Sequence, residues 1–364
     1  MAPTASSSCS SVGGLDPGRY EPIVALPAGE LADALASRGV EVIERPLAVI
    51  RRGLRSPARL GALTAALTRD AAALTALVRR RHIALIHSNT SVVLGGAPAA
   101  AATRRPHIWH VREIYARYAR MWPAYRRLLL TAAALPCVSH ATAAQFGGDR
   151  RAQVIYDGLA IDARRAPRAA ARHALGVAGD APVVAVLGRI SDWKGQDVLV
   201  RALAAPPLRD RGAIALLAGE PWPGAEERQA QVVSLARQLG VGDRVRFAGF
   251  VADVDTVYGA ADIVAVPSTA PDPLPNAAIE AAAAGCAVVA AAHGGLPEII
   301  QDGRTGCLVT PGDATALAQV IAGLLDDPTR RDRLGEAAAT DVRERFSAAR
   351  QAGAIQSLYD RLTA

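Results

Sequence analysis

Lysine is almost absent from this sequence. Of its 41 basic residues Lys194 is the one lysine, and the other 40 are arginines. A chain with this bias is expected to use arginine wherever either cation would serve. A compact ammonium group can act as a point charge on a phosphate, unlike the planar guanidinium fork. Lys194 therefore marks a position where phosphate chemistry is expected, with an accident of composition as the alternative.

Several other signals are missing. The cysteines (Cys9, Cys137, Cys286, Cys307) stand far apart without a CxxC pair, which argues against a zinc site or disulfide framework and suits a reducing cytoplasm. No apolar run reaches the roughly eighteen residues of a membrane span. Residues 1–12 lack the charged start and apolar stretch of a signal peptide. No strand is followed by GxGxxG and no GxxxxGK[ST] occurs, which argues against dinucleotide oxidoreductases and P-loop NTPases.

Charge is distributed unevenly along the 364 residues. Residues 1–165 hold 22 arginines against 11 acids, a net charge of +11, and the remainder holds 19 basic residues against 23 acids, a net charge of −4, which together give +7. A basic first half suits an anionic surface as partner. Nucleic acid is not expected, because no recognition motif accompanies the charge.

Strand-like apolar segments alternate with helical ones along most of the chain. This pattern predicts an α/β fold with parallel sheets. The first series runs over residues 20–158 and the second over 182–310, and the charged, Ala-rich stretch 162–174 joins them. Two doubly wound domains facing a cleft are expected, over residues 1–165 and 175–346, followed by a last helix over 347–364.

The stretch with the densest motifs is residues 266–298, VPSTAPDPLPNAAIEAAAAGCAVVAAAHGGLPE. It predicts a strand end, a proline-rich loop, a helix from Asn276, a second strand, and a Gly294-Gly295 turn that opens another helix. A similar turn, from Gly188-Arg189 to Lys194-Gly195, connects an earlier strand to a helix. Such turns present unpaired backbone N–H groups and the positive end of a helix dipole, which is how α/β proteins hold phosphate.

Asp272, then Glu280 after seven intervening residues, then Gly-Gly-x-x-Glu ending at Glu298 resembles the donor-site signature of family 4 of the retaining glycosyltransferases. The turn from Gly188 to Gly195 resembles the Gly-Arg…Lys-Gly motif of the same family. The resemblance covers roughly residues 20–364. It implies the GT-B fold of two Rossmann-like domains, with a nucleoside-diphosphate sugar as donor and a last helix that crosses back onto the first domain.

The resemblance also implies a role for each residue of the motifs. Arg189 and Lys194 would stabilise the departing diphosphate, Glu280 would bind the donor ribose, and Asp272 would touch the transferred sugar. The further donor contacts implied are Pro273, Leu274 and Pro275 at the sugar, Gly294 and Gly295 at the phosphates, Phe250 and Val251 at the base, and Gly188 and Glu298 within the motifs. Two positions depart from the family pattern, since Asp272 stands in place of glutamate and Pro275 in place of glycine, which removes an N–H donor.

The first domain contributes fewer candidates. His110, at the end of the strand-like HIWH, is the histidine that the resemblance places at the transferred sugar; His107 competes for this role, and a structural role is the alternative. Residues 114–133 predict a helix that carries Tyr115, Tyr118, Trp122 and Tyr125 among Arg117, Arg120, Arg126 and Arg127. Such a helix suits an anionic membrane surface, and a core stripe with a solvated face is the equal alternative.

The family resemblance implies a metal-independent retaining glycosyltransferase without a cofactor. It would move a sugar to an acceptor hydroxyl, lipid-linked or not, in glycolipid, polysaccharide or cell-envelope glycan synthesis. The expected location is the cytoplasm or the inner face of the membrane. The alternatives are a sugar-nucleotide epimerase of GT-B fold and an inactive, sugar-nucleotide-binding partner subunit.

The first domain is also expected to lack its first strand. GT-B first domains begin with a strand, a Gly-rich turn and a helix, but Leu15–Pro27 already resembles the end of that helix and the second strand. Only the Ser-rich residues 1–14 precede them, and these are expected to be disordered. The first strand of a doubly wound sheet is central, so without it two neighbouring strands would have unpaired edges.

Overall fold

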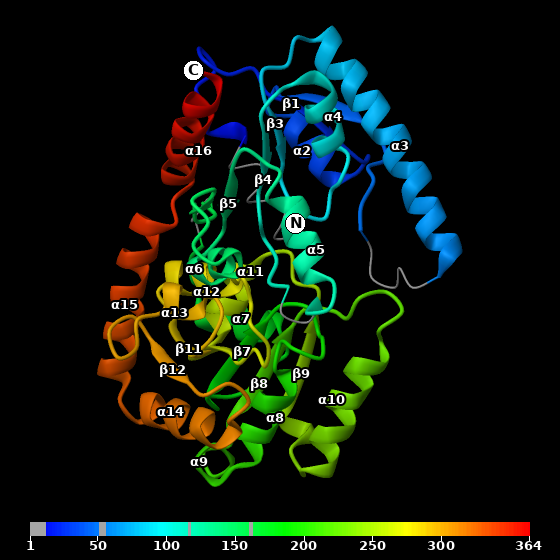
Figure 1. The fold of residues 1–364 in the computed structure, drawn as a ribbon. Coiled ribbons are helices and arrows are strands. Elements are labelled where there is room, and N and C mark those ends of the chain that lie inside the picture. The colour runs from blue at the N-terminus through cyan, green and yellow to red at the C-terminus, as the bar shows by residue number, and fades with distance from the viewer. Residues whose placement is uncertain (1–11, 51–55, 116–117, 160–162) are drawn as a thin grey trace. The chain divides into compact units, whose positions relative to one another are not determined.

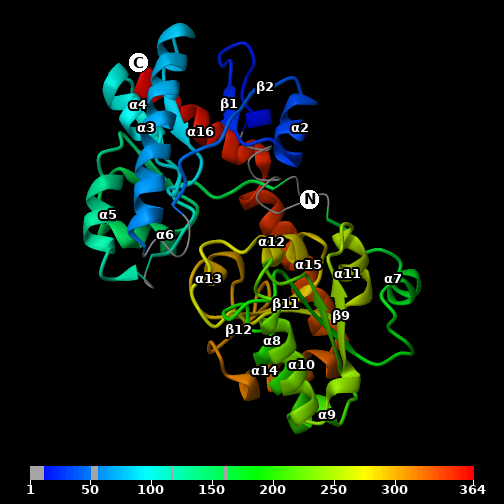
Figure 2. The same ribbon diagram turned by 90° about the vertical axis from the view of Figure 1, so that its right-hand side faces the viewer.

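The computed structural model describes residues 12–50, 56–115, 118–159 and 163–364. The chain forms two compact units (Figures 1 and 2): unit 1 is Met1–Ala160 with Phe346–Ala364, and unit 2 is Ile161–Arg345. Every pair of named strands among the described residues is parallel. The predicted α/β fold with parallel sheets is therefore confirmed.

Unit 2 is built on one six-stranded sheet. Its strands are β7 (Val183–Leu187), β8 (Ile214–Ala218), β9 (Val245–Gly249), β10 (Ile263–Val266), β11 (Ala287–Ala291) and β12 (Cys307–Val309), in the spatial order β12-β11-β10-β7-β8-β9. The chain first builds outward from β7 on one side and then returns to its other side with β10. The carboxyl ends of β7 and β10 are thus the switch point of the sheet, where open α/β sheets bind their ligands.

Helices cover both faces of this sheet (Figure 2). On one face lie α8 (Gln196–Ala204), α10 (Glu227–Gln238) and α14 (Ala314–Asp326). On the other lie α11 (Val254–Ala260) and α12 (Asn276–Ala283), and α15 (Pro328–Arg345) packs against α12. The short helices are α7 (Arg168–Ala174), α9 (Pro206–Arg209), α13 (Leu296–Ile299) and the 3-10 helix η3 (Gly242–Arg244). Because both faces are covered, β10 and β11 are unbroken apolar runs, IVAV and AVVAA, buried throughout.

The described residues of unit 1 contain six short strands in three parallel pairs. These are β1 (Ile23–Leu26) with β2 (Glu41–Glu44), β3 (Ile86–Ser88) with β4 (His107–Trp109), and β5 (Leu135–Cys137) with β6 (Ala152–Val154). Single bridges, such as Val111 to Cys137, join β4 to the β5 pair, whereas no ladder within residues 12–159 as described joins β1 to β3. The expectation about residues 1–14 falls almost wholly on residues 1–11, which lie outside the described residues.

The described residues of unit 1 include the helices α2 (Glu30–Ala36), α3 (Pro57–Arg80), α4 (Gly96–Thr103), α5 (Trp122–Leu129), α6 (His140–Ala143), the 3-10 helix η2 (Ala144–Phe146) and α16 (Ala348–Thr363). The long helix α3 begins at Pro57, where the Ser56 side chain caps it by accepting a hydrogen bond from the Arg59 backbone N–H. The last helix, α16, belongs to this unit: its Ile355 and Leu358 pack with Ile108 of β4 in one buried cluster.

The helix predicted over residues 114–133 is wrong in its extent, since α5 spans only Trp122–Leu129. Pro123 has no N–H, so it fits the first turn of a helix but not the interior of one that starts at residue 114. Tyr115 instead packs into the core, 8% exposed, with its ring stacked 5.0 Å from that of Trp122. Part of the aromatic stripe is therefore core, as one of the two alternatives held, whereas Tyr118 is 50% exposed. Arg117 lies outside the described residues.

Candidate functional site

An ion pair crosses the switch point of the unit 2 sheet. Lys194, from the turn after β7, places its Nζ 2.6 Å from Oδ2 of Asp272, which lies in the loop after β10. The two side chains are 20% and 8% exposed. Gly195 lets the two segments approach this closely: its φ is 76°, and an added Cβ would lie 1.9 Å from the carbonyl oxygen of Pro267. Two residues that stand 78 positions apart thus form one charged site.

Arg189 supplies a second cation in the same turn. It is exposed, and its guanidinium carbon lies 3.5 Å from the ring centroid of Trp222, which follows β8. Among the described residues no carboxylate lies within ion-pair distance of Arg189. Gly188, which precedes it, donates its backbone N–H to the Ala218 carbonyl (2.9 Å) and so holds the turn beside the end of β8. The sequence did not point to Trp222.

The Gly294-Gly295 turn after β11 packs against the Asp272 backbone. The Gly295 N–H donates to the Asp272 carbonyl (2.8 Å), and the His293 Nε2 lies 2.7 Å from the Ser268 carbonyl oxygen. An added Cβ would lie 2.4 Å from the Asp272 carbonyl oxygen at Gly294 and 2.1 Å from the Pro273 carbonyl oxygen at Gly295, which explains the two glycines structurally. Their approach to phosphates stays a prediction. The helix that follows, α13, is a single turn containing Glu298, so its dipole is small.

Glu280 lies in the second turn of α12, where its side chain is half-buried. Its Oε2 accepts a hydrogen bond from the Tyr258 hydroxyl (3.2 Å), and burial raises the pKa of Glu280 to about 7 despite that bond. One phenol leaves this carboxyl with further acceptor positions, which suits a pair of sugar hydroxyls. In the described part of the chain, neither Glu280 nor Asp272 belongs to a group of three or more His, Cys, Asp or Glu residues that could hold a metal ion.

The remaining predicted donor contacts lie on neighbouring loops. Pro273 is half-buried and Leu274 and Pro275 are buried, and Pro275 precedes α12 directly without an N–H of its own. Phe250 and Val251 follow β9, beside the end of β8, where the Gly219 N–H donates to the Gly249 carbonyl (2.7 Å). Phe250 is 60% exposed, which leaves its ring free to stack on a planar group.

His110 of unit 1 is fully buried after β4. Its ring stacks on that of His87 with a centroid distance of 5.4 Å, and neither of its ring nitrogens has a hydrogen-bond partner among the described residues. Burial holds the pKa of His110 well below its usual value, so the ring is neutral. His107, the competing histidine, has a structural partner in the Ser88 hydroxyl at 3.0 Å. The His87 Nδ1 lies 2.6 Å from the Tyr359 hydroxyl oxygen of α16. The sequence did not point to His87.

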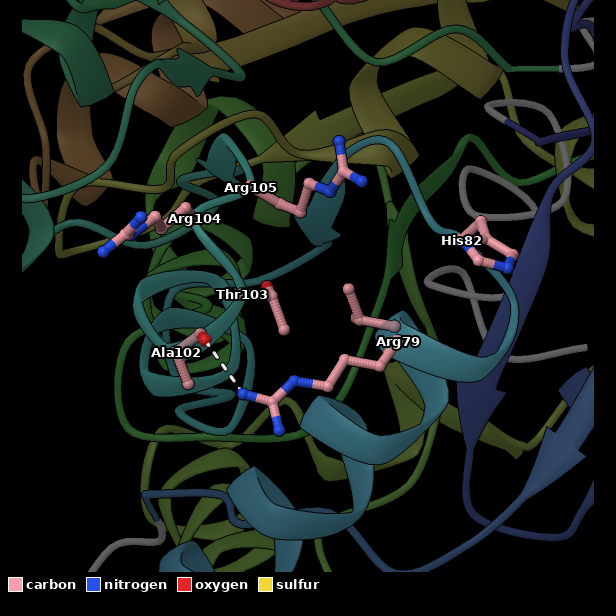
Figure 3. A pocket seen from close by; sticks show the side chains of 7 residues that line it. Arg79, His82, Ala102, Thr103, Arg104 and Arg105 are labelled. Atoms are coloured by element: carbon pink, nitrogen blue, oxygen red, sulfur yellow. Dashed lines mark hydrogen bonds between the residues drawn. The ribbon is translucent and has the colours of Figure 1, made fainter.

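A second group of cations lines a hollow of about 480 Å³ where α3 and α4 end (Figure 3). Its lining residues are Val78, Arg79, His82, Ala102, Thr103, Arg104 and Arg105. Arg79 donates to the carbonyl of Ala102 at 3.3 Å, and Figure 3 shows the charged ends of Arg104 and Arg105 pointing away from each other. These cations offset the negative ends of two helix dipoles and do not converge on a ligand.

Residues 167–341 match the protein-family model described as "Glycosyl transferases group 1". A D-inositol 3-phosphate glycosyltransferase from Kribbella flavida is 41% identical over 178 residues, which are 47% of this chain and 42% of that protein. D-inositol 3-phosphate glycosyltransferase 2 from Catenulispora acidiphila is 38% identical over 228 residues, which are 59% of this chain and 52% of that protein. The chain thus spans about half the length of the curated relatives it matches.

A solved structure resembles the whole chain. The crystal structure of Anabaena Alr3699/HepE in complex with UDP-glucose superposes with a TM-score of 0.82 and 27% identity. The superposition covers 100% of this chain and 97% of that chain. The likeness therefore extends over both units.

Proposed function

We propose that this chain transfers a sugar from a nucleoside-diphosphate sugar to an acceptor hydroxyl, because residues 167–341 match the model of the group 1 glycosyltransferases. The fold class is that of the GT-B glycosyltransferases, as the sequence predicted. The observation that carries the proposal is the arrangement at the switch point of unit 2. There Lys194 and Asp272 meet at 2.6 Å, and Arg189 lies in the same turn as Lys194.

The two cations suit the leaving group of this reaction. A nucleoside diphosphate gains negative charge as its bond to the anomeric carbon breaks, and fixed donors aimed at that charge lower the barrier. Arg189 offers a planar fork of N–H donors to two phosphate oxygens, whereas Lys194 offers a point charge. We assign to both the stabilisation of the departing diphosphate, without a metal ion.

Retention of configuration is the stereochemical part of the proposal. The bond from the anomeric carbon to the diphosphate oxygen breaks while the bond to the acceptor oxygen forms on the same face of the sugar. The departing phosphate oxygen takes the acceptor's proton, so no side chain need act as a nucleophile. Asp272 would bind a sugar hydroxyl without forming a covalent bond, and a contact of His110 with the transferred sugar stays a prediction from the family resemblance.

The donor is best sought among uridine-diphosphate sugars. Anabaena Alr3699/HepE, which the whole chain resembles, was crystallised with UDP-glucose. In this chain Glu280 would accept hydrogen bonds from the ribose hydroxyls, and the exposed Phe250 ring would lie against the base. The curated relatives act, by their names, on D-inositol 3-phosphate, so a phosphorylated polyol is the first acceptor to try beside glycan and lipid-linked hydroxyls.

The experiment is to incubate the full chain with UDP-glucose and other nucleotide sugars and to measure the release of nucleoside diphosphate. We expect slow release with water as acceptor and faster release with a hydroxyl acceptor. NMR of the product should show the anomeric configuration of the donor. Conversion of the donor sugar without release would indicate an epimerase, and binding without turnover would indicate an inactive subunit; either result would overturn the proposal.

We further propose that α5 and the residues before it bind an anionic membrane surface. Tyr118, Met121 and Leu128 are 50%, 72% and 41% exposed. Arg120 and Arg127, also exposed, form no ion pair within the described residues, so apolar rings and chains lie beside unneutralised cations. No helix in the described ranges is both long and apolar enough to cross a bilayer.

Vesicle binding tests this surface with a matched control. Replacing both Arg120 and Arg127 by glutamine should weaken binding to phosphatidylglycerol-containing vesicles roughly thirtyfold, from about 1 kcal/mol for each arginine. Replacing Arg38 and Arg80, exposed arginines elsewhere in unit 1, removes the same charge and should have a much smaller effect. Equal losses in the two double variants would show that net charge, and not α5, governs binding. Wild-type chain that ignores such vesicles at low salt would refute the surface outright.

A further inference from the structure

The two cations of the candidate site are held in different ways. Lys194 is paired with the Asp272 carboxylate, and its Nζ also lies 4.4 Å from the ring centroid of Trp193. Arg189 has an aromatic ring where Lys194 has a carboxylate: its guanidinium carbon lies 3.5 Å from the centroid of Trp222, a stacking distance. This difference raises the question of what Trp222 contributes to Arg189.

The backbone brings Trp222 to Arg189 by a fixed register. The turn after β7 and the turn after β8 continue side by side beyond the sheet, because the Ile190 N–H donates to the Glu220 carbonyl (3.1 Å) and Ile190 bridges to Pro221. Trp222 follows at once. Its side chain is 50% exposed, so burial in the core does not account for an indole at this position.

Stacking orients a guanidinium group without neutralising it. A carboxylate partner would take two of its five N–H donors and cancel its charge. An indole face attracts the cation through the ring quadrupole and leaves the donors in the guanidinium plane free for oxygen atoms. An arginine that must bind a diphosphate needs this combination of fixed orientation and free donors.

We infer that Trp222 is a positioning residue that holds Arg189 toward the donor diphosphate. The inference rests on the proposed function, because it assigns Arg189 a diphosphate to bind. It adds a residue to the site that lies outside every sequence motif. The inference also gives the two cations different roles. The carboxylate of Asp272 partly neutralises the charge of Lys194, whereas the charge of Arg189 remains available to the ligand.

The test is a double-mutant cycle on Arg189 and Trp222, measured as the dissociation constant of uridine diphosphate by calorimetry. We expect Trp222→Leu to weaken binding roughly two- to thirtyfold, the range of a cation–π contact between exposed and desolvated sites. Trp222→Phe, which keeps an aromatic face, should recover most of the loss. In an Arg189→Ala chain, Trp222→Leu should have no further effect, because the ring then has no cation to hold. Leu239→Ala, a partly exposed apolar residue of unit 2, is the control and should change nothing.

Inorganic pyrophosphate, added as a competitor, identifies the part of the ligand through which Trp222 acts. Its affinity should fall by the same factor as that of uridine diphosphate in Trp222→Leu. Two results would show that Trp222 contacts the nucleoside directly and would overturn the inference. One is that Trp222→Leu lowers the affinity for uridine diphosphate but not for pyrophosphate. The other is that it lowers the affinity for uridine diphosphate as much in the Arg189→Ala chain as in the wild type. Thermal unfolding of each variant separates these outcomes from a loss of fold.

The proposed function fails by a different result. Wild-type chain that binds no nucleoside diphosphate at all would refute the function and this inference with it. Wild-type chain that binds uridine diphosphate, but with Arg189 and Trp222 uncoupled, would refute the inference alone.

Discussion

Replacing Lys194 by arginine keeps the positive charge of the site and changes its shape. The ammonium group lies 2.6 Å from one oxygen of Asp272 and is 20% exposed, in a turn that the close contact of Gly195 with Pro267 fixes. A guanidinium group in this place would meet the same carboxylate with two parallel N–H donors, its preferred geometry. Arginine at position 194 would therefore face Asp272 and not the diphosphate.

The two variants Lys194→Arg and Lys194→Met should separate catalysis from stability. Loss of one well-placed donor to developing charge costs about 3–4 kcal/mol of barrier, or roughly 10²–10³-fold in turnover. Lys194→Arg retains the ion pair, so its Tm should stay within about 2 °C of wild type. Lys194→Met leaves the Asp272 carboxylate, 8% exposed, without its cation, which costs about 2–4 kcal/mol and lowers the Tm by roughly 4–16 °C.

The assay pairs initial rates of nucleoside-diphosphate release at saturating donor with scanning calorimetry of the same samples. Turnover of Lys194→Arg within about threefold of wild type would refute the reasoning, since the ammonium would then be replaceable. A Lys194→Arg variant with both a lower rate and a lower Tm would also refute the reasoning, because the lost rate would then come from a disrupted turn.

Four further predictions concern metal, pH and backbone. EDTA should leave turnover intact, because Arg189 and Lys194 supply the positive charge; a loss that magnesium or manganese restores would contradict this. The affinity for a nucleotide sugar should rise as the pH passes about 7, because the Glu280 carboxyl, with its raised pKa, ionises there and becomes a full acceptor. Calorimetric titration of the Glu280→Gln variant should show no such rise. Between pH 4.5 and about 7 the folded chain keeps a proton that the unfolded chain has released, so the contribution of Glu280 to the free energy of unfolding falls as pH rises, and the glutamine variant should lack this slope. Gly195→Ala should lower the Tm much more than Gly212→Ala does. Both glycines have a left-handed φ, but an added Cβ would collide with Pro267 at Gly195 and meets nothing within 4 Å at Gly212. Equal losses of Tm would show that the contact with Pro267 is unimportant.

The sequence predicted the parallel sheet of unit 2 because covered strands are continuous apolar runs, as in β10 and β11. Resemblance to two separate motifs of one family also assigned Lys194 and Asp272 to the same donor site, and the structure places their charged atoms together. The roles of the individual site residues stay predictions. What the pattern could do was find turns at strand ends, since those are local features of the chain.

Contacts made by tertiary packing were beyond the sequence. Trp222 reaches Arg189 only because β8 lies beside β7, and Tyr258 reaches Glu280 only because α11 lies near α12. The extent of α5 was misjudged for a related reason. Tyr115 has the spacing of a helical residue, but its ring gains more by stacking on Trp122 in the core, and Pro123 favours a start at that point.

The assignment of α16 to unit 1 has a consequence for how the chain folds during synthesis. Unit 2 is one continuous stretch, Ile161–Arg345, whereas unit 1 needs both Met1–Ala160 and Phe346–Ala364. Leu159 bridges to Ser347, and Gln351 donates to the Asp157 carboxylate at 3.0 Å. The ribosome therefore synthesises all of unit 2 before the last part of unit 1. Residues 1–160 cannot complete their fold until residues 346–364 have been made. An early collapse of unit 2 would shorten the effective loop between these two parts and lower the entropy cost of joining them.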